Sequence, residues 1–231
     1  MCGRYTHLYT WRQIHDQLEG FLTSLRSALA EAEGPEPKYN VAPRSEVPVV
    51  AVREGVLAPA TMRWWLVPHW SRTPDSKYAT FNARSEDAHT KPAFRSAFRK
   101  GRCIVPASGF YEWRKNADDT KTPMYITRAD GQPLLFAALT DAWGDASIGP
   151  QLETCTVLTT TPNAEMSRVH NRMPCLLEPE QVEAWVDADR SVDDARSLLR
   201  PAADGLLVMH EVGRDVGRVT NQGAHLIEPV G

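Results

Sequence analysis

The sequence predicts an α+β fold, a single mixed domain in which a β-rich, barrel-like core is flanked by short helices. Short runs of β-branched and aromatic residues recur along the chain and are separated by turn signals. The segments with helical periodicity are short and scattered among these runs. No repeat, low-complexity tract or shift in composition marks a linker, so we expect one domain over residues 1–231.

The N-terminal segment predicts a helix followed by an extended loop. Thr10 and Gln13 have the spacing of a capping box, so a helix should run from there to about Leu29, with a break near Gly20. Residues 34–48 contain four prolines, which disfavour a helix, so we expect an extended loop there.

The strand candidates are short apolar runs bounded by glycine, proline or acidic residues. They are Val47–Arg53, Ala60–Val67, Arg102–Pro106, Gly109–Arg114, Met124–Arg128, Leu134–Leu139, Thr154–Thr159 and Leu206–Val212. Glu54-Gly55 predicts a turn between the first two runs, and Asp130-Gly131 predicts a hairpin turn.

Short helices are expected between and after these strands. Thr161 followed by Pro162 is typical of a helix cap with proline at the first helical position. The expected helical segments are Ala93–Lys100, Asn163–Val169, Pro179–Val186 and Ser191–Leu199.

Composition limits the class of protein. The chain has 231 residues, 42% hydrophobic and 24% charged, and can bury a substantial core. No run approaches about eighteen apolar residues and no signal-peptide pattern is present, so we expect no membrane span and a cytoplasmic location. The four cysteines form no C-x-x-C pair, so we expect neither a disulfide framework nor a metal site. Without a P-loop or G-x-G-x-x-G, we expect no nucleotide or other cofactor.

Positive charge is concentrated in the middle of the chain, although the net charge is −3. Residues 61–115 contain eleven lysines and arginines but four acidic residues, an excess of seven positive charges. This asymmetry favours a basic face on an acidic protein, as phosphate binding requires. The alternative is a mixed, solvated surface.

Cys2 directly follows the initiator methionine. Because cysteine is a small second residue, we expect Met1 to be removed, which leaves a free amine and a thiol on one residue. Such a 1,2-aminothiol captures aldehydes, because the amine forms an imine and the thiol then closes a thiazolidine ring. An α-amino group has a pKa near ~7.7–8.0, so it is partly neutral at pH 7 and ready to attack. The plainer interpretation is an early strand residue.

Five segments place polar residues where packing alone would not require them. They are Cys2-Gly3-Arg4, Tyr39–Pro43, Phe81–Glu86, Arg102–Trp113 and His170–Pro174. In this order the chain resembles the SOS response-associated peptidase (SRAP) family, whose members process abasic sites in single-stranded DNA. The motifs fall within residues 2–175, and we expect residues 176–231 to add helices and a strand to the same domain.

The resemblance implies a covalent reaction with DNA. The ring-opened sugar of an abasic site is an aldehyde, which the Cys2 amine and thiol would capture as a stable thiazolidine crosslink. A weak AP-lyase activity is also implied, because an imine permits β-elimination of the strand.

Three further residues receive roles from the resemblance. Glu112 would lie beside the N-terminal amine and assist proton transfer, and His170 would assist sugar ring opening and the imine steps. Asn82 would hold the sugar or the amine in the abasic pocket through its amide. From the residues alone, an exposed strand carboxylate, a structural histidine and a turn asparagine are the plainer interpretations.

Other motif residues are candidates for contact with DNA. Arg4 and Arg84 could clamp phosphates, because a guanidinium binds phosphate through two parallel hydrogen bonds. Asn40, Pro43 and Thr159 are expected to line the pocket.

Tryptophans alternate with cations just upstream of the Asn82 motif. Trp64, Trp65 and Trp70 interleave with Arg63 and Arg72, as in a platform on which bases stack while phosphates meet charge. At strand spacing Trp64 and Trp65 point to opposite faces, so we expect one of them to lie in the core.

Two other functions stay open at this point. A thiol peptidase could use Cys2 as nucleophile and its own amine as base. A non-catalytic module would bind intact single strands without preference for an abasic site. In the leading hypothesis the partner is single-stranded DNA containing abasic sites, and the protein acts as a monomer.

Overall fold

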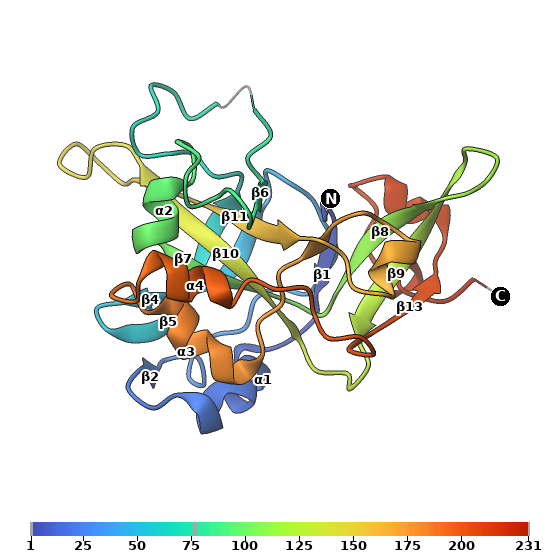
Figure 1. The fold of residues 1–231 in the computed structure, drawn as a ribbon, viewed down its shortest axis with the longest axis horizontal. Coiled ribbons are helices and arrows are strands. Elements are labelled where there is room, and N and C mark those ends of the chain that lie inside the picture. Colours follow the sequence, from blue (N-terminus) through green and yellow to red (C-terminus); the bar gives the residue numbers. More distant parts are fainter. Residues whose placement is uncertain (1, 76–77, 231) are drawn as a thin grey trace.

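Five strands close into a ring at the centre of the molecule (Figure 1). They are β4 (Glu46–Arg53), β5 (Val56–Trp64), β7 (Arg102–Ala107), β10 (Leu134–Trp143) and β11 (Leu152–Thr160). Neighbours in the order β5-β4-β7-β10-β11 pair antiparallel, and β11 pairs in parallel with β5, which closes the ring. This computed structural model describes residues 2–75 and 78–230, and it confirms the α+β class with a barrel core.

A second, five-stranded antiparallel sheet extends from the barrel, at the right of Figure 1. Its order is β3 (Lys38–Val41), β1 (Tyr5–His7), β8 (Gly109–Lys115), β9 (Lys121–Arg128) and β13 (Leu207–Glu211). The segment 34–48, predicted as an extended loop, therefore contains β3. Because β1 lies between β3 and β8, both edges of the N-terminal strand are hydrogen-bonded.

Gly109 is required where β1, β8 and β9 meet. A Cβ atom on Gly109 would lie 2.5 Å from Cζ of Tyr125. The Tyr125 hydroxyl lies 2.8 Å from Oγ1 of Thr6, so the ring crosses the glycine to reach β1.

Three short strands lie against the barrel. β2 (Arg26–Ser27) pairs in parallel with β5, and β6 (Asn82–Arg84) pairs in parallel with β11. β12 (Met173–Pro174) pairs antiparallel with β11. The last two strands bring two of the sequence motifs to the same barrel strand.

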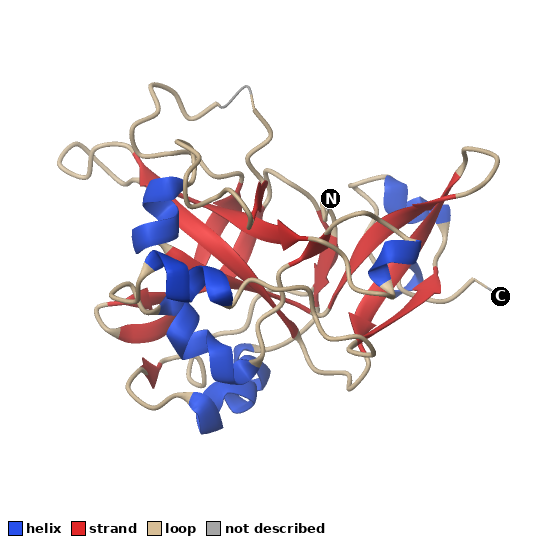
Figure 2. Cartoon of the chain, viewed as in Figure 1, coloured by secondary structure: helices blue, strands red, loops and turns tan. Residues whose placement is uncertain are grey.

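The helices gather on one side of the barrel (Figure 2). They are α1 (Trp11–Leu18), α2 (Arg95–Lys100), α3 (Val182–Val186) and α4 (Val192–Ser197). In α1 the buried residues are Trp11, Ile14 and Leu18, which form one face at helical spacing. The segments predicted at 93–100, 179–186 and 191–199 are thus confirmed.

Strand β7 separates two layers of the core. Cys103, Val105 and Ala107 pack inside the barrel, whereas Ile104 packs with the helices and Trp185 of α3. Successive strand residues point to opposite faces, so a strand covered on both faces is apolar at almost every position. This explains the uninterrupted apolar run that predicted the strand.

The N-terminal helix is shorter than predicted. The capping box is confirmed, because the Gln13 amide donates to Thr10 Oγ1 at 3.2 Å and the Thr10 amide donates to Gln13 Oε1 at 2.8 Å. After α1 the chain forms a 3₁₀ turn, η1 (Glu19–Phe21), so a helix to Leu29 is wrong. The backbone at 26–27 bonds to β5 as β2 instead.

The predicted strands are present, but one predicted hairpin is wrong. The Glu54-Gly55 turn between β4 and β5 is confirmed, with both residues at positive φ (50° and 76°). β5 begins before the predicted Ala60 and ends before Val67. At Asp130-Gly131 the chain turns but passes between sheets, since β9 pairs with β8 and β13 while β10 pairs with β7 and β11.

The helix predicted at Asn163–Val169 is a single 3₁₀ turn, η2 (Met166–Arg168). Thr161 is not its cap: the cap position is Glu165, which makes no side-chain cap bond, while Asn163 Oδ1 accepts from the Met166 amide at 3.0 Å. The remaining 3₁₀ turns are η3 (Pro179–Gln181), η4 (Arg214–Gly217) and η5 (Ala224–Leu226).

Across residues 2–75 and 78–230, every helix is too short or too polar to cross a bilayer.

A buried histidine on β1 predicts acid sensitivity of the fold. His7 is 2% exposed, and burial, together with the charge of Lys38, lowers its pKa to about 4. The unfolded chain takes up this proton near pH ~6.5, but the folded chain does not until about pH 4. Above pH ~6.5 the neutral His7 therefore costs the folded state nothing. Between pH ~6.5 and about 4, protonation of His7 in the unfolded chain lowers the free energy of unfolding by roughly 3 kcal/mol.

The test compares urea unfolding of the wild type and of His7→Phe across this pH range. The variant should lose less unfolding free energy as the pH falls, because it has no group to protonate at this position. Equal losses in the two proteins would contradict the burial argument.

Candidate active site at the N-terminus

The pairing of β1 with β8 brings the start of the chain beside Glu112. Tyr5 is paired with Phe110, and the Tyr111 amide donates to the Arg4 carbonyl at 2.9 Å. Cys2 itself is fully buried, and Met1 lies outside the described residues. The ladder therefore fixes the position of Cys2.

Asn82 anchors Cys2 from the opposite strand. It lies at the start of β6, paired with Val157 of β11, and its Nδ2 donates to the Cys2 carbonyl at 2.7 Å. Its Oδ1 is buried and accepts no hydrogen bond within the described part of the chain. The amide thus holds Cys2 with one end and offers an acceptor to a ligand with the other.

Glu112 and His170 complete the cluster. The Glu112 side chain is 5% exposed, and its Oε1 lies 3.9 Å from Nδ1 of His170, which is 26% exposed. His170 Nδ1 also accepts from the Arg172 amide at 3.0 Å. When Nδ1 accepts this bond, the proton of the neutral ring lies on Nε2. The pair can therefore move protons at a partly accessible position.

The Cys2 thiol is held in its protonated form. Burial, and then the negative charge of Glu112, raise the pKa of Cys2 well above its usual range. A thiol in this state is a weak initial nucleophile, whereas an amine on the same residue would not suffer this penalty for attack as a neutral group.

An ion pair that sequence reasoning missed holds the His170 segment against β6. The Arg172 guanidinium binds the Glu86 carboxylate through two bonds, Nη1–Oε1 at 2.5 Å and Nη2–Oε2 at 2.8 Å. The hydrogen bond from Arg172 lowers the pKa of Glu86. Both residues belong to the quoted motifs. No spacing in the sequence indicated that they pair, because the two motifs are far apart along the chain.

Arg4 and Asn40 join the N-terminus to the C-terminal segment. Arg4 Nη1 donates to Asn40 Oδ1 at 2.7 Å and to the Val216 carbonyl at 2.6 Å. Asn40 Nδ2 lies within 3.2 Å of the carbonyl oxygens of Val216, Arg218 and Asn221. Asn40 is buried, and its amide bonds to Arg4 and to the C-terminal segment. A contact between Asn40 and DNA stays a prediction. A phosphate contact by Arg4 stays a prediction.

The two neighbouring tryptophans differ as expected, and Trp64 is the one that lies in the core. Trp64 is 1% exposed and donates to the Phe81 carbonyl at 2.8 Å, so no ring face is open to a base. Trp65 is half-buried, tilted against the Phe81 ring at 5.7 Å. The Arg44 guanidinium lies 4.4 Å from the Trp65 ring centre, a cation–π contact absent from the sequence analysis.

The other predicted contacts divide between surface and interior. Arg84 is exposed on β6, next to the cluster. Arg63 is half-buried, with Nη2 3.8 Å from Asp75 Oδ1, and Pro43 is half-buried in a cavity of about 810 Å³ beside β3. Thr159 is fully buried on β11, and its place in the lining of the abasic pocket stays a prediction.

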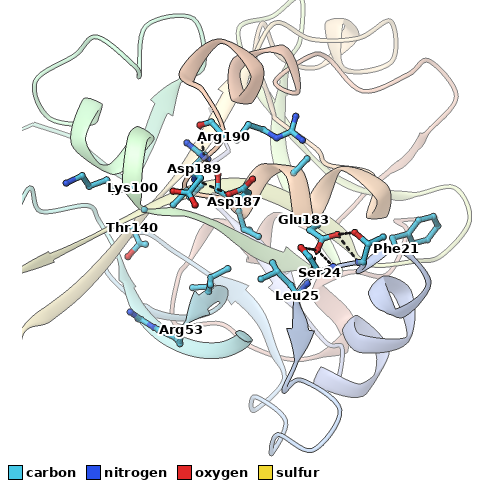
Figure 3. A pocket seen from close by; sticks show the side chains of 18 of the residues that line it. Phe21, Ser24, Leu25, Arg53, Lys100, Thr140, Glu183, Asp187, Asp189 and Arg190 are labelled. Atoms are coloured by element: carbon cyan, nitrogen blue, oxygen red, sulfur yellow. Dashed lines mark hydrogen bonds between the residues drawn. The ribbon is translucent and has the colours of Figure 1, made fainter. Parts of the chain in front are cut away.

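Two other features lie outside the cluster. A cavity of about 760 Å³ between α3 and the barrel contains none of the four clustered residues (Figure 3). Among the described residues, His15, Asp16 and Glu19 could offer ligand atoms within 4.8 Å of one another. They lie on and just after α1, where His15 Nδ1 is also 3.2 Å from Ser27 Oγ, as in an ordinary surface cluster.

Residues 1–219 match the family described as SOS response associated peptidase (SRAP), and the chain belongs to this family. It is 34% identical over 229 residues to the abasic site processing protein YoqW of Bacillus subtilis, covering 99% of both chains. It is 33% identical to the abasic site processing protein YedK of Escherichia coli, covering 100% of both. HMCES of Gallus gallus, also named an abasic site processing protein, is 30% identical over 84% of this chain and 66% of its own.

Solved structures share the fold. A crystal structure of a protein from Bacteroides thetaiotaomicron superposes with a TM-score of 0.82 at 23% identity, covering 99% of this chain and 100% of that one. A Bordetella bronchiseptica protein gives a TM-score of 0.74 at 28% identity, covering 92% and 100%.

Removing the Asn40 amide should loosen the C-terminal segment. Asn40→Ala leaves buried carbonyls and the Arg4 guanidinium without their partner, so unfolding in urea should cost about 2–4 kcal/mol less. The control is Asn116→Ala, whose amide bonds the hydroxyls of the exposed Thr120 and the buried Thr122 in a surface turn and whose loss should cost under ~1 kcal/mol. Similar losses in both variants would show that Asn40 is not an anchor.

Proposed function

We propose that this protein processes abasic sites in single-stranded DNA by forming a covalent crosslink through Cys2 after removal of Met1. The observation that carries the proposal is the convergence of Asn82, Glu112 and His170 on Cys2, from β6, β8 and the segment after η2. The names of the relatives support the substrate class.

The proposed reaction balances without a cofactor. The Cys2 nitrogen attacks the C1′ aldehyde of the ring-opened deoxyribose, and the carbonyl oxygen leaves as water to give an imine. The Cys2 Sγ then adds to the same carbon, its proton passes to the nitrogen, and a thiazolidine forms. Because both groups belong to one residue, the effective molarity of the thiol can reach ~10⁵–10⁸ M. β-Elimination from the imine is the competing, lyase-like outcome.

The surrounding groups fit these steps. Glu112, next to Cys2, can take a proton from the attacking amine and return it to the departing oxygen. His170 Nε2 can serve the sugar oxygen, and Asn82 Oδ1 can accept from a sugar hydroxyl or from the amine. The protonated thiol explains why nitrogen reacts first and sulfur second.

The surface near the cluster suits a single strand. Arg84 is exposed on β6, two residues after Asn82, where it can meet a phosphate beside the lesion. Trp70, in the loop between β5 and β6, is 57% exposed and can stack on a base.

Cys2→Ala should abolish the stable adduct, because it keeps the amine but removes the thiol that closes the ring. Cys2→Ser should form an imine that only a reducing trap makes permanent. Denaturing gels of each protein with an abasic oligonucleotide measure both outcomes, and intact single strands serve as the binding control. A heat-stable adduct with Cys2→Ala would overturn the thiazolidine mechanism.

Glu112→Gln should slow adduct formation by roughly 10²–10³-fold, because the amide keeps the shape but cannot exchange protons. Its affinity for an intact single strand should stay unchanged, since the proposed role is in the reaction and not in strand binding. Single-turnover rates on an abasic oligonucleotide, with anisotropy on the intact strand, separate the two quantities. An unchanged rate would remove Glu112 from the mechanism.

A further inference from the structure

Helix α2 carries cations that the fold does not use. Arg95, Arg99 and Lys100 are exposed, and within the described residues none of the three pairs with a carboxylate. Nearby Lys91, by contrast, has its Nζ 3.7 Å from Oδ2 of Asp87. The α2 cations are thus an unbalanced cluster within the basic part of the sequence.

Arg95 is unfavourably placed in the absence of a ligand, whereas Arg99 and Lys100 lie in the last turn, where the helix favours cations. Arg95 and Arg99 are four residues apart, so two like charges share one face of the helix. Arg95 is also the first residue of α2, whose first turn contains no acidic residue, and a positive charge is unfavourable at that end. An anion bound across this face would remove both penalties.

These cations border a groove that also contains an exposed aromatic side chain. The groove has a volume of about 550 Å³ and no acidic residue in its lining. It is formed by His69, Trp70, Pro92, Arg95, Ser96, Arg99 and Lys100. This combination of flat aromatic and cationic groups is typical of single-strand binding surfaces.

Trp70 is held in this exposed position by its neighbours. The His69 amide donates to Asp141 Oδ2 at 3.0 Å, and the Trp143 indole donates to the Ser71 carbonyl at 2.8 Å. With the backbone fixed on both sides, the indole is presented to solvent without the entropy loss of ordering a free loop.

The groove, which we name the α2 groove, is linked to the Cys2 cluster along the chain. Trp70, after β5, lines the groove, and Asn82, the first residue of β6, lies in the cluster. Beyond Lys100, the cavity in Figure 3 is lined by acidic residues, including Glu183, Asp187 and Asp189, that alternate with cations such as Arg53 and Arg190. The α2 groove, whose lining contains no acidic residue, is therefore the more favourable of the two surfaces for a polyanion.

We propose that the α2 groove binds the phosphate backbone of the single strand that flanks the abasic site. This inference rests on the proposed function for the identity of the lesion, but it concerns the affinity for the strand rather than the chemistry. Arg95 and Arg99 meet successive phosphates, and Trp70 stacks on a base between the groove and the cluster.

The test is the double variant Arg95→Gln/Arg99→Gln, matched with Lys115→Gln/Lys121→Gln, which removes the same charge from the exposed β8–β9 hairpin. Anisotropy measures binding of an intact single strand of about 20 nucleotides over a range of KCl concentrations. The α2 variant should bind about tenfold more weakly, and its slope of log affinity against log salt should fall by roughly 1.4, that is two phosphates. The control should lose less than about twofold.

Strand length and strand state complete the test. On an abasic strand shortened to about 6 nucleotides, which leaves few phosphates beyond the lesion for the groove, the α2 variant should crosslink at a rate closer to that of the wild type than on the long strand. Equal losses in the two double variants, or a loss confined to strands with a duplex flank, would overturn the α2 proposal. Absence of any crosslink in the wild type would instead overturn the proposed function, while the binding comparison would still decide the role of the groove.

Discussion

The pairing of β1 along both of its edges is the constraint on which the candidate site depends. A chain terminus is ordinarily free to fray, because nothing fixes its backbone. Here β3 and β8 bond the first strand on either side, and the Asn82 amide holds the Cys2 carbonyl from a third direction. Cys2 is therefore as well positioned as a residue of the core. In the proposed function, removal of Met1 would make its backbone nitrogen a placed nucleophile.

In the proposed reaction, burial and charge around Cys2 set the order of the steps. A buried thiol beside a carboxylate stays protonated, so in this proposal it would not compete with the amine for the aldehyde. Once nitrogen had bonded to the sugar, the sulfur would lie next to the imine carbon by covalent geometry alone. The same burial would exclude water, which otherwise hydrolyses an imine.

Much of the fold could be predicted because its signals are local. The capping box at Thr10, the Glu54-Gly55 turn and the apolar run of β7 depend on neighbouring residues only. The end of the first helix and the turn at Asp130-Gly131 were wrong because strand partners decide them, and those partners are far away in sequence.

The candidate site was likewise predictable only in part. The resemblance to the family predicted that four residues share one site, namely Cys2, Asn82, Glu112 and His170. In the structure these residues lie in one cluster. The sequence alone did not indicate that Asn40 and Thr159 are buried, because polar residues inside and outside the core have the same spacing in these motifs. The Arg172–Glu86 pair, and the bonds from Asn40 to residues 216–221, join distant segments and leave no periodic pattern.

The proposed crosslink through Cys2 can be tested by peptide mapping of the purified adduct with tandem mass spectrometry. We expect a sugar remnant on a peptide that begins at Cys2, with Met1 absent and with both nitrogen and sulfur bonded to one carbon. A remnant on any lysine, or on a peptide that still begins with Met1, would contradict it.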